Sequence, residues 1–171
     1  MRGDAQAARR LSLGRKPAPL AWLVALLVVT IDQASKFWAL AVLPFGEVRS
    51  LWPGLLQLRR VSNTGAAFSL FTGSTPLLGL VSLAVAIGVV VLLLRQPPTK
   101  PLPALALGFL LGGAVGNGVD RWRLGAVIDF LEFVPIPFPV FNIADVAINL
   151  AVLCFAVDAL AGLRREVSRD A

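Results

Sequence analysis

Four long apolar stretches constrain this chain more than any other feature of its sequence. Each approaches the ~20 residues that an α-helix needs to cross the hydrocarbon core of a bilayer. They occupy most of the 171 residues, and only 15% of the residues are charged, whereas soluble domains carry about 25%. The sequence therefore predicts an all-α membrane protein with four transmembrane helices in one domain, 20–163. The spans are expected at 20–43, 77–94, 102–119 and 142–163.

The basic residues outside these spans predict how the chain is oriented. Cytoplasmic flanks of spanning helices carry an excess of Lys and Arg. The tails 1–19 and 164–171 and the connection 95–101 together hold ten such residues, whereas the other two connections hold five. We therefore expect both termini in the cytoplasm and the connections 44–76 and 120–141 outside. The net charge of +6 belongs to these flanks, so no nucleic acid is expected as a partner.

The two outer connections carry local patterns of their own. Leu56–Val61 partly alternates between apolar and polar residues, which predicts a short strand, and the following Asn63–Gly65 predicts a turn. We therefore expect a small extracytoplasmic β/loop element between helices 1 and 2. In the second connection, Pro135, Pro137 and Pro139 exclude a regular helix and predict an extended, stiff segment.

Two charged residues, Asp32 and Lys36, lie inside the first span. Because they are four residues apart, they share a helix face and can form an ion pair. One interpretation is a self-neutralised pair in which Lys36 reaches the interface. The other is a functional role, because charges inside a membrane are costly. The pair also argues against reading the first span as a cleaved signal peptide that ends near Ala39–Ala41.

The residue types that are missing exclude several kinds of catalysis. The chain has no histidine, so Ser-His and Cys-His nucleophile pairs cannot form, and the commonest zinc ligand is absent. The single cysteine, Cys154, lies in an apolar run and is interpreted as a small core residue. Hydrolytic chemistry must then come from carboxylates, lysine or a metal with oxygen ligands. No motif indicates a metal or a cofactor, and we expect none.

The third span ends in an unusual mixture of small and polar residues, 112–121. Its glycines permit close approach of helices. The polar members Asn117, Asp120 and Arg121 lie at one depth near the outer interface. A structural interpretation is an amide cap at the helix end with a local Asp-Arg pair. That interpretation explains the glycines better than it explains the polar cluster.

Two aspartates near the outer interface are the candidate catalytic groups. Asp129 is flanked by apolar residues, and its structural alternative is an exposed loop residue. Asp145 follows Asn142 by three residues, so it can simply complete a capping box at a helix N-terminus. Two carboxylates at one depth also suit an aspartic dyad that shares one proton. Because a helix N-terminus favours negative charge, we predict that Asp145 holds the charge and Asp129 the proton.

At these residues the sequence resembles the lipoprotein signal peptidase family, also called signal peptidase II. The resemblance covers roughly 20–163, and its specificity lies in the order and spacing of five short motifs rather than in any one of them. These motifs are Asp32–Lys36, Asn63–Phe68, Gly116–Arg121, Val127–Phe130 and Phe141–Asp145.

The resemblance implies a protease of the bacterial inner membrane with its active site near the outer leaflet. Its substrates would be prolipoprotein signal peptides, cut just before a diacylglyceryl-modified cysteine, with membrane lipids and globomycin-type inhibitors as further ligands. Asp129 and Asp145 map onto the catalytic pair. The residues implied to contact substrate or shape the site are Asn63, Gly65, Asn117, Asp120, Arg121, Asn142, Asp32 and Lys36.

Two other functions remain open from the residues alone. A Ser-Lys protease would use Lys36 as the base with Ser35, Ser62 or Ser69, but Asp32 would keep the lysine charged. A small ion-coupled transporter would also carry intramembrane acids. However, no chain of polar residues leads from this cluster toward the cytoplasm.

Overall fold

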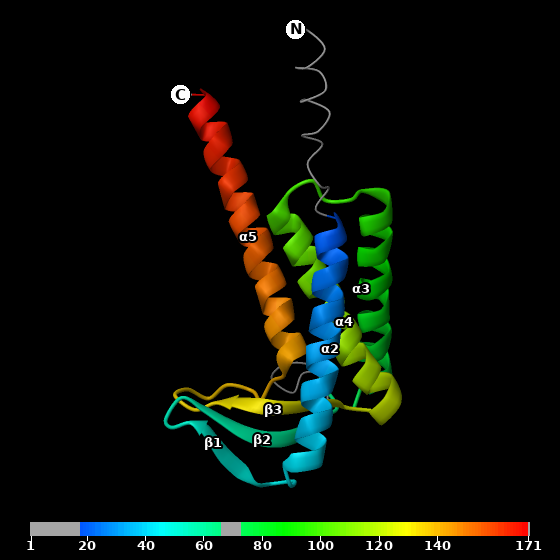
Figure 1. Ribbon diagram of the computed structural model, residues 1–171, viewed down its shortest axis with the longest axis vertical. Coiled ribbons are helices and arrows are strands. Elements are labelled where there is room, and N and C mark those ends of the chain that lie inside the picture. The colour runs from blue at the N-terminus through cyan, green and yellow to red at the C-terminus, as the bar shows by residue number, and fades with distance from the viewer. Residues whose placement is uncertain (1–17, 66–72, 171) are drawn as a thin grey trace, which may run out of the picture.

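The structure, a computed structural model, describes residues 18–65 and 73–170. Residues 1–17, 66–72 and 171, which include most of the predicted N-terminal tail and the end of the Asn63–Phe68 motif, lie outside it. All four predicted transmembrane helices are present, and each is long and apolar enough to span a membrane. Figure 1 shows them running roughly along the long axis of the molecule. They are α2 (Ala18–Val42), α3 (Thr75–Arg95), α4 (Pro101–Leu124) and α5 (Ile143–Asp170).

Two helices continue well beyond their predicted C-terminal ends. Helix α4 continues five residues beyond position 119, so Asn117 lies inside the helix and the amide-cap interpretation is wrong. The helix ends instead at Gly125, which has a φ of 70° and donates its backbone N–H to the carbonyl of Arg121, as expected of a left-handed C-terminal cap. Helix α5 continues through the expected tail to Asp170.

Helix α4 is the central helix of the bundle and packs against the other three. In the apolar membrane-spanning segment of α4, 61% of the residues are buried inside the protein, compared with 28% or less in the other three helices. Its glycines allow this close packing. A Cβ atom on Gly108 would lie 2.6 Å from the backbone oxygen of Ala21, and one on Gly112 would lie 2.5 Å from Cβ of Val28. Helix α2 therefore contacts the backbone of α4 directly.

We expect Gly108→Ala to destabilise the fold by about 1–3 kcal/mol, because the added methyl group forces the backbone of α2 away from α4. Gly88→Ala in α3 is the matched control, since its Cβ would meet nothing within 4 Å. The control should be neutral or stabilising by up to about 1 kcal/mol, because alanine favours helix more than glycine does. Thermal unfolding in detergent measures both changes. Equal unfolding temperatures would contradict the packing argument.

A three-stranded antiparallel sheet lies across one end of the helices (Figure 1). Its strands are β1 (Val48–Trp52), β2 (Leu56–Asn63) and β3 (Val127–Phe133). The strand predicted at 56–61 is thus confirmed as part of β2. Strand β3 comes from the second outer connection, however, so the interpretation of Asp129 as an exposed loop residue is wrong. Two distant outer connections together build one sheet.

The proline-rich segment that follows β3 reverses the chain direction. Residues 134–137 form a turn rather than a wholly extended run. The chain then returns, and Phe141 and Leu131 exchange backbone hydrogen bonds of 2.8 and 2.9 Å. This pairing brings the start of α5 beside β3.

A small apolar cluster fixes the sheet to the helices. It contains Ala39 of α2, Leu43 directly after α2, Leu58 of β2 and Phe130 of β3. The last turn of α2, the sheet and the first turn of α5 therefore meet at one end of the molecule. The beginning of α2 and the end of α5 lie at the opposite end (Figure 1).

Candidate active site

Asp129 lies on β3, and its side chain is 2% exposed. Its neighbour Asn63 pairs with Val127 in the β2–β3 ladder, and Asp129 pairs with Val61. Because side chains two residues apart on a strand share a face, Asn63 and Asp129 are diagonal neighbours. The Asn63 amide donates a hydrogen bond of 3.0 Å from Nδ2 to Oδ2 of Asp129.

Asp145 lies in the first turn of α5, where it forms the predicted capping box with Asn142. The side chain of Asn142 accepts a hydrogen bond from the backbone N–H of Asp145 at 3.0 Å. The carboxylate of Asp145 accepts one from the backbone N–H of Asn142 at 3.1 Å. Each side chain therefore satisfies a backbone donor at the helix N-terminus. The carboxylate of Asp145 is therefore both a member of the capping box and a candidate catalytic group.

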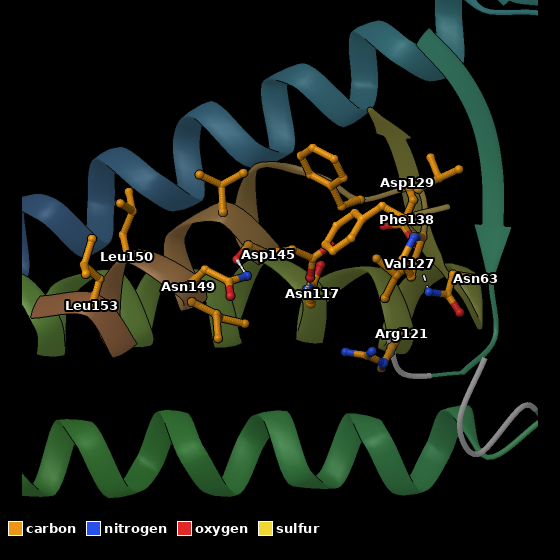
Figure 2. A pocket seen from close by; sticks show the side chains of 15 residues that line it. Asn63, Asn117, Arg121, Val127, Asp129, Phe138, Asp145, Asn149, Leu150 and Leu153 are labelled. Carbon is orange, nitrogen blue, oxygen red and sulfur yellow. Dashed lines mark hydrogen bonds between the residues drawn. The ribbon is translucent and has the colours of Figure 1, made fainter. Parts of the chain in front are cut away.

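Asn142 connects the two aspartates. It is fully buried, and its Nδ2 donates to Oδ1 of Asp129 at 2.6 Å and to Oδ1 of Asn117 at 3.0 Å. The Nδ2 atom of Asn117 in turn donates to Oδ1 of Asp145 at 2.8 Å. Both aspartates thus belong to one hydrogen-bonded network of amides, which Figure 2 shows in part.

The aspartate pair faces a cavity of about 570 Å³. Its polar end contains Asn63, Asn117 and Arg121 beside the two carboxylates, and the rest of its wall is mainly apolar (Figure 2). The apolar wall comes from the proline-rich segment and from one face of α5. The lining residues of this wall include Phe138, Pro139, Val140, Phe141, Val146, Ile148, Leu150 and Leu153.

The pKa of Asp129 is raised to about 7, mainly by burial and next by the nearby carboxylate of Asp145. Hydrogen bonds from Asn63 and Asn142 and the charge of Lys36 act in the opposite direction. Burial wins because removing a carboxylate from water disfavours its charged form. Asp129 is therefore suited to carry a proton near neutral pH.

Behind the aspartate pair lies a buried ionic cluster. Lys36 is 2% exposed, and its ammonium contacts Oδ2 of Asp32 at 2.9 Å and Oδ2 of Asp120 at 3.0 Å. The interpretation in which Lys36 reaches the interface is therefore wrong. Asp120 pairs with Lys36 of α2 rather than with Arg121, so the local Asp-Arg pair is wrong too. The glycine at 116, where a Cβ would lie 2.6 Å from Asp32, lets α2 approach α4 closely.

Arg121 and Gly65 hold the end of β2 near the cavity. The backbone N–H of Gly65 donates to Oδ1 of Asn63 at 2.9 Å. The guanidinium of Arg121 donates to the carbonyl of Gly65 and to the hydroxyl of Ser82, each at 3.3 Å. Arg121 therefore links α4, α3 and the chain after β2, and it helps to fix Asn63 beside Asp129.

The serines proposed for a Ser-Lys protease do not form such a site in the described part of the chain. Ser35 donates its hydroxyl to the carbonyl of Asp32 at 2.8 Å, while the ammonium of Lys36 binds two carboxylates. Ser62 lies within β2 and pairs with Ile128 in the sheet. Ser69 lies outside the described residues.

All ten site residues predicted from the sequence lie in or directly behind this site. Sequence reasoning gave no role to Gln33, whose Nε2 donates to Asp32, to Asp120 and to the carbonyl of Gly116. A polar residue between two charges in an apolar span was a usable signal. The apolar stripe of α5 was also missed, although it recurs at helical spacing after Asp145.

Comparisons with solved structures define the class of protein. Two structures described as bacterial membrane enzymes superpose on this chain with TM-scores of 0.78 and 0.75. Both are 26% identical to it, and the alignments cover 84% and 83% of this chain and 88% and 93% of theirs. The fold is therefore that of a bacterial membrane enzyme.

Sequence comparisons define the family. Residues 24–161 match the model of the Peptidase_A8 family, described as signal peptidase (SPase) II. A lipoprotein signal peptidase from Parasynechococcus marenigrum is 57% identical over 135 residues, which are 79% of this chain and 85% of that protein. Another lipoprotein signal peptidase, from Gloeobacter violaceus, is 47% identical over 142 residues, which are 83% of this chain and 82% of that protein.

This chain belongs to the signal peptidase II family. It is a multi-pass bacterial membrane protease that removes signal peptides from prolipoproteins. The resemblance found in the sequence is confirmed.

Proposed function

We propose that Asp129 and Asp145 are the catalytic pair with which this peptidase cleaves the peptide bond before a diacylglyceryl-modified cysteine. The observation that carries the proposal is the bridging amide of Asn142, which is bonded to both residues. The two carboxylates line the same cavity. The chain contains no histidine, so no imidazole is available as a base. The direct test is cleavage of lipid-modified precursor by the purified protein and its Asp→Asn variants.

The two aspartates would divide the chemistry between them. The ionised carboxylate takes a proton from the attacking water, while the protonated one donates a hydrogen bond to the scissile carbonyl. Asp145 is assigned the charge because the backbone N–H of Asn142 and the amide of Asn117 both donate to it at the N-terminus of α5. Asp129, whose pKa is about 7, is assigned the proton.

Infrared titration of the two single Asn variants tests this division, since each variant retains one carboxyl group of a pair that otherwise titrates as a unit. We expect the carboxyl of Asp129, retained in Asp145→Asn, to have the higher pKa. A higher pKa for the carboxyl retained in Asp129→Asn would reverse the assignment.

The apolar wall of the cavity suits a lipid-modified substrate. A peptide entering at the aspartate pair would have its signal-peptide residues or acyl chains against Leu150 and Leu153 of α5. This arrangement fits an active site near the outer leaflet with both termini in the cytoplasm, as the basic residues predict. Surrounding membrane lipids would contact the exposed apolar faces of the helices.

A globomycin-type cyclic peptide would occupy the same cavity, so we expect it to inhibit competitively with the lipid-modified precursor. Initial rates at several precursor and inhibitor concentrations measure this. Inhibition that high precursor concentration does not relieve would place the inhibitor elsewhere.

We expect kcat/KM to fall above about pH 7, approaching tenfold per pH unit, because Asp129 then loses the proton that it must hold. Asn63→Ala removes a hydrogen bond that favours the charged form of Asp129. The pKa of Asp129 should then rise, and the alkaline limb should move to higher pH. Cleavage rates of wild type and variant across pH 5–9 measure both effects. An alkaline limb that stays in place would show that another group controls it.

A further inference from the structure

We propose that Lys36 is a positioning residue for the aspartate pair and acts through the amide of Asn117. The inference rests on the proposed catalytic roles of Asp129 and Asp145. Lys36 is not among the residues that line the cavity. Lys36 therefore acts without touching the substrate: its charge favours the ionised form of Asp129, and its ammonium orients the groups that it binds.

The ammonium of Lys36 decides which way the Asn117 amide faces. A lysine ammonium has three donors and no acceptor, and the three oxygens bound by Lys36 are those of Asp32, Asp120 and Asn117. The last contact is 2.9 Å long. Asn117 must therefore present its Oδ1 to Lys36. Its only side-chain donor, Nδ2, is then directed at Oδ1 of Asp145 at 2.8 Å.

The same polarity continues to the other aspartate. Asn142 uses its Oδ1 to accept the backbone N–H of Asp145, so its Nδ2 is the group left to donate. That Nδ2 donates both to Oδ1 of Asn117 and to Oδ1 of Asp129. If the Asn117 amide were reversed, donor would face donor at Lys36 and at Asn142, and acceptor would face acceptor at Asp145. Lys36 thus fixes the network in the one direction that supplies donors to both aspartates.

The two carboxylate partners of Lys36 hold the backbone just ahead of each catalytic residue. Oδ1 of Asp32 accepts the N–H of Ala144 at 2.9 Å. Oδ2 of Asp120 accepts the N–H of Ile128 at 3.1 Å. Ala144 immediately precedes Asp145, and Ile128 immediately precedes Asp129. The ammonium of Lys36 therefore binds both carboxylates that hold the backbone next to Asp129 and Asp145.

Packing of the helices alone would not require this arrangement. Buried ion clusters can often be replaced by apolar side chains without loss of stability. A cluster kept only to join α2 and α4 would need no contact with Asn117. The Lys36–Asn117 contact is what distinguishes positioning of the site from a merely structural role.

A double-mutant cycle on kcat tests the inference. The proteins are wild type, Lys36→Met, Asn117→Ala and the double variant, assayed with saturating diacylglyceryl-modified precursor. Each single variant should lose about 10²-fold in kcat with KM changed less than about threefold. If Lys36 acts through Asn117, the double variant should be no more than about threefold worse than the worse single variant, because residues that act as a unit are non-additive. Losses that multiply would overturn the inference.

Lys100→Met is the matched control, because Lys100 pairs with Asp158 at 3.6 Å, away from the aspartate pair. It should leave kcat unchanged, and its effect should be additive with Asn117→Ala. If Lys36→Met does not fold, the cycle is run in an Asp120→Asn background, which leaves one buried carboxylate without its cation instead of two. Wild-type cleavage by Asp129→Asn or Asp145→Asn would refute the proposed function. Multiplying losses in an active enzyme would refute only the role of Lys36.

Discussion

Asp129→Asn and Asp145→Asn are each expected to reduce cleavage of diacylglyceryl-modified precursor by about 10³-fold or more, because each removes a proton donor or acceptor from the reacting bond. The amide has almost the shape of the carboxyl group, so the fold should survive. In Asp145→Asn the side-chain oxygen can still accept the backbone N–H of Asn142, and the other hydrogen bond of the capping box uses only the backbone N–H of residue 145. Release of the signal peptide from purified precursor in detergent or liposomes measures the loss.

Asp158→Asn provides the matched control for these two variants. Asp158 lies on α5 like Asp145, but its partner is Lys100, and neither residue lines the cavity. Its activity should stay within about threefold of wild type, as is usual for a substitution away from the reacting groups. Unfolding temperatures of all three variants should lie within about 5 °C of wild type. A folded Asp129→Asn or Asp145→Asn protein that cleaves at the wild-type rate would remove that residue from the catalytic pair.

The transmembrane helices and the cap at Asn142 could be predicted because both depend on local sequence. Span length follows from bilayer thickness and the rise of a helix. The capping box depends on two side chains three residues apart, so Asn142 and Asp145 were sufficient to predict it. The depth of the polar residues follows from their place in each span. Local rules therefore placed the two aspartates at the same end of the helices.

The contacts between segments could not be predicted in the same way. Strand β3 pairs with β2 across more than sixty residues of chain, and its sequence alone does not exclude a loop. Asp32 and Lys36 were predicted to pair, but the burial of Lys36 depends on Asp120 and Asn117 of α4. Which face of α4 meets α2 is decided by close glycine contacts along the whole helix. Such tertiary choices override local preference.

Asn142 should be the residue whose replacement best separates stability from catalysis. Its amide caps α5 through Oδ1 and serves Asp129 and Asn117 through Nδ2. Asn142→Ser should keep most of the cap, because a serine hydroxyl accepts the same backbone hydrogen bond. It cannot reach Asp129, however. We therefore expect kcat to fall by about 10²-fold with nearly wild-type stability. Precursor cleavage and thermal unfolding of the same preparation measure both quantities.

Asn142→Ala is the comparison variant for Asn142→Ser. It loses the cap as well as the bridge, so it should show a similar fall in kcat and an additional loss of about 1 kcal/mol in stability. Both variants also remove a donor that favours the charged form of Asp129. The pKa of Asp129 should rise, and the alkaline limb of the rate profile should move to higher pH in both. An Asn142→Ser enzyme with wild-type kcat would mean that the bridge does not position the pair, and that Asn142 acts only as a helix cap.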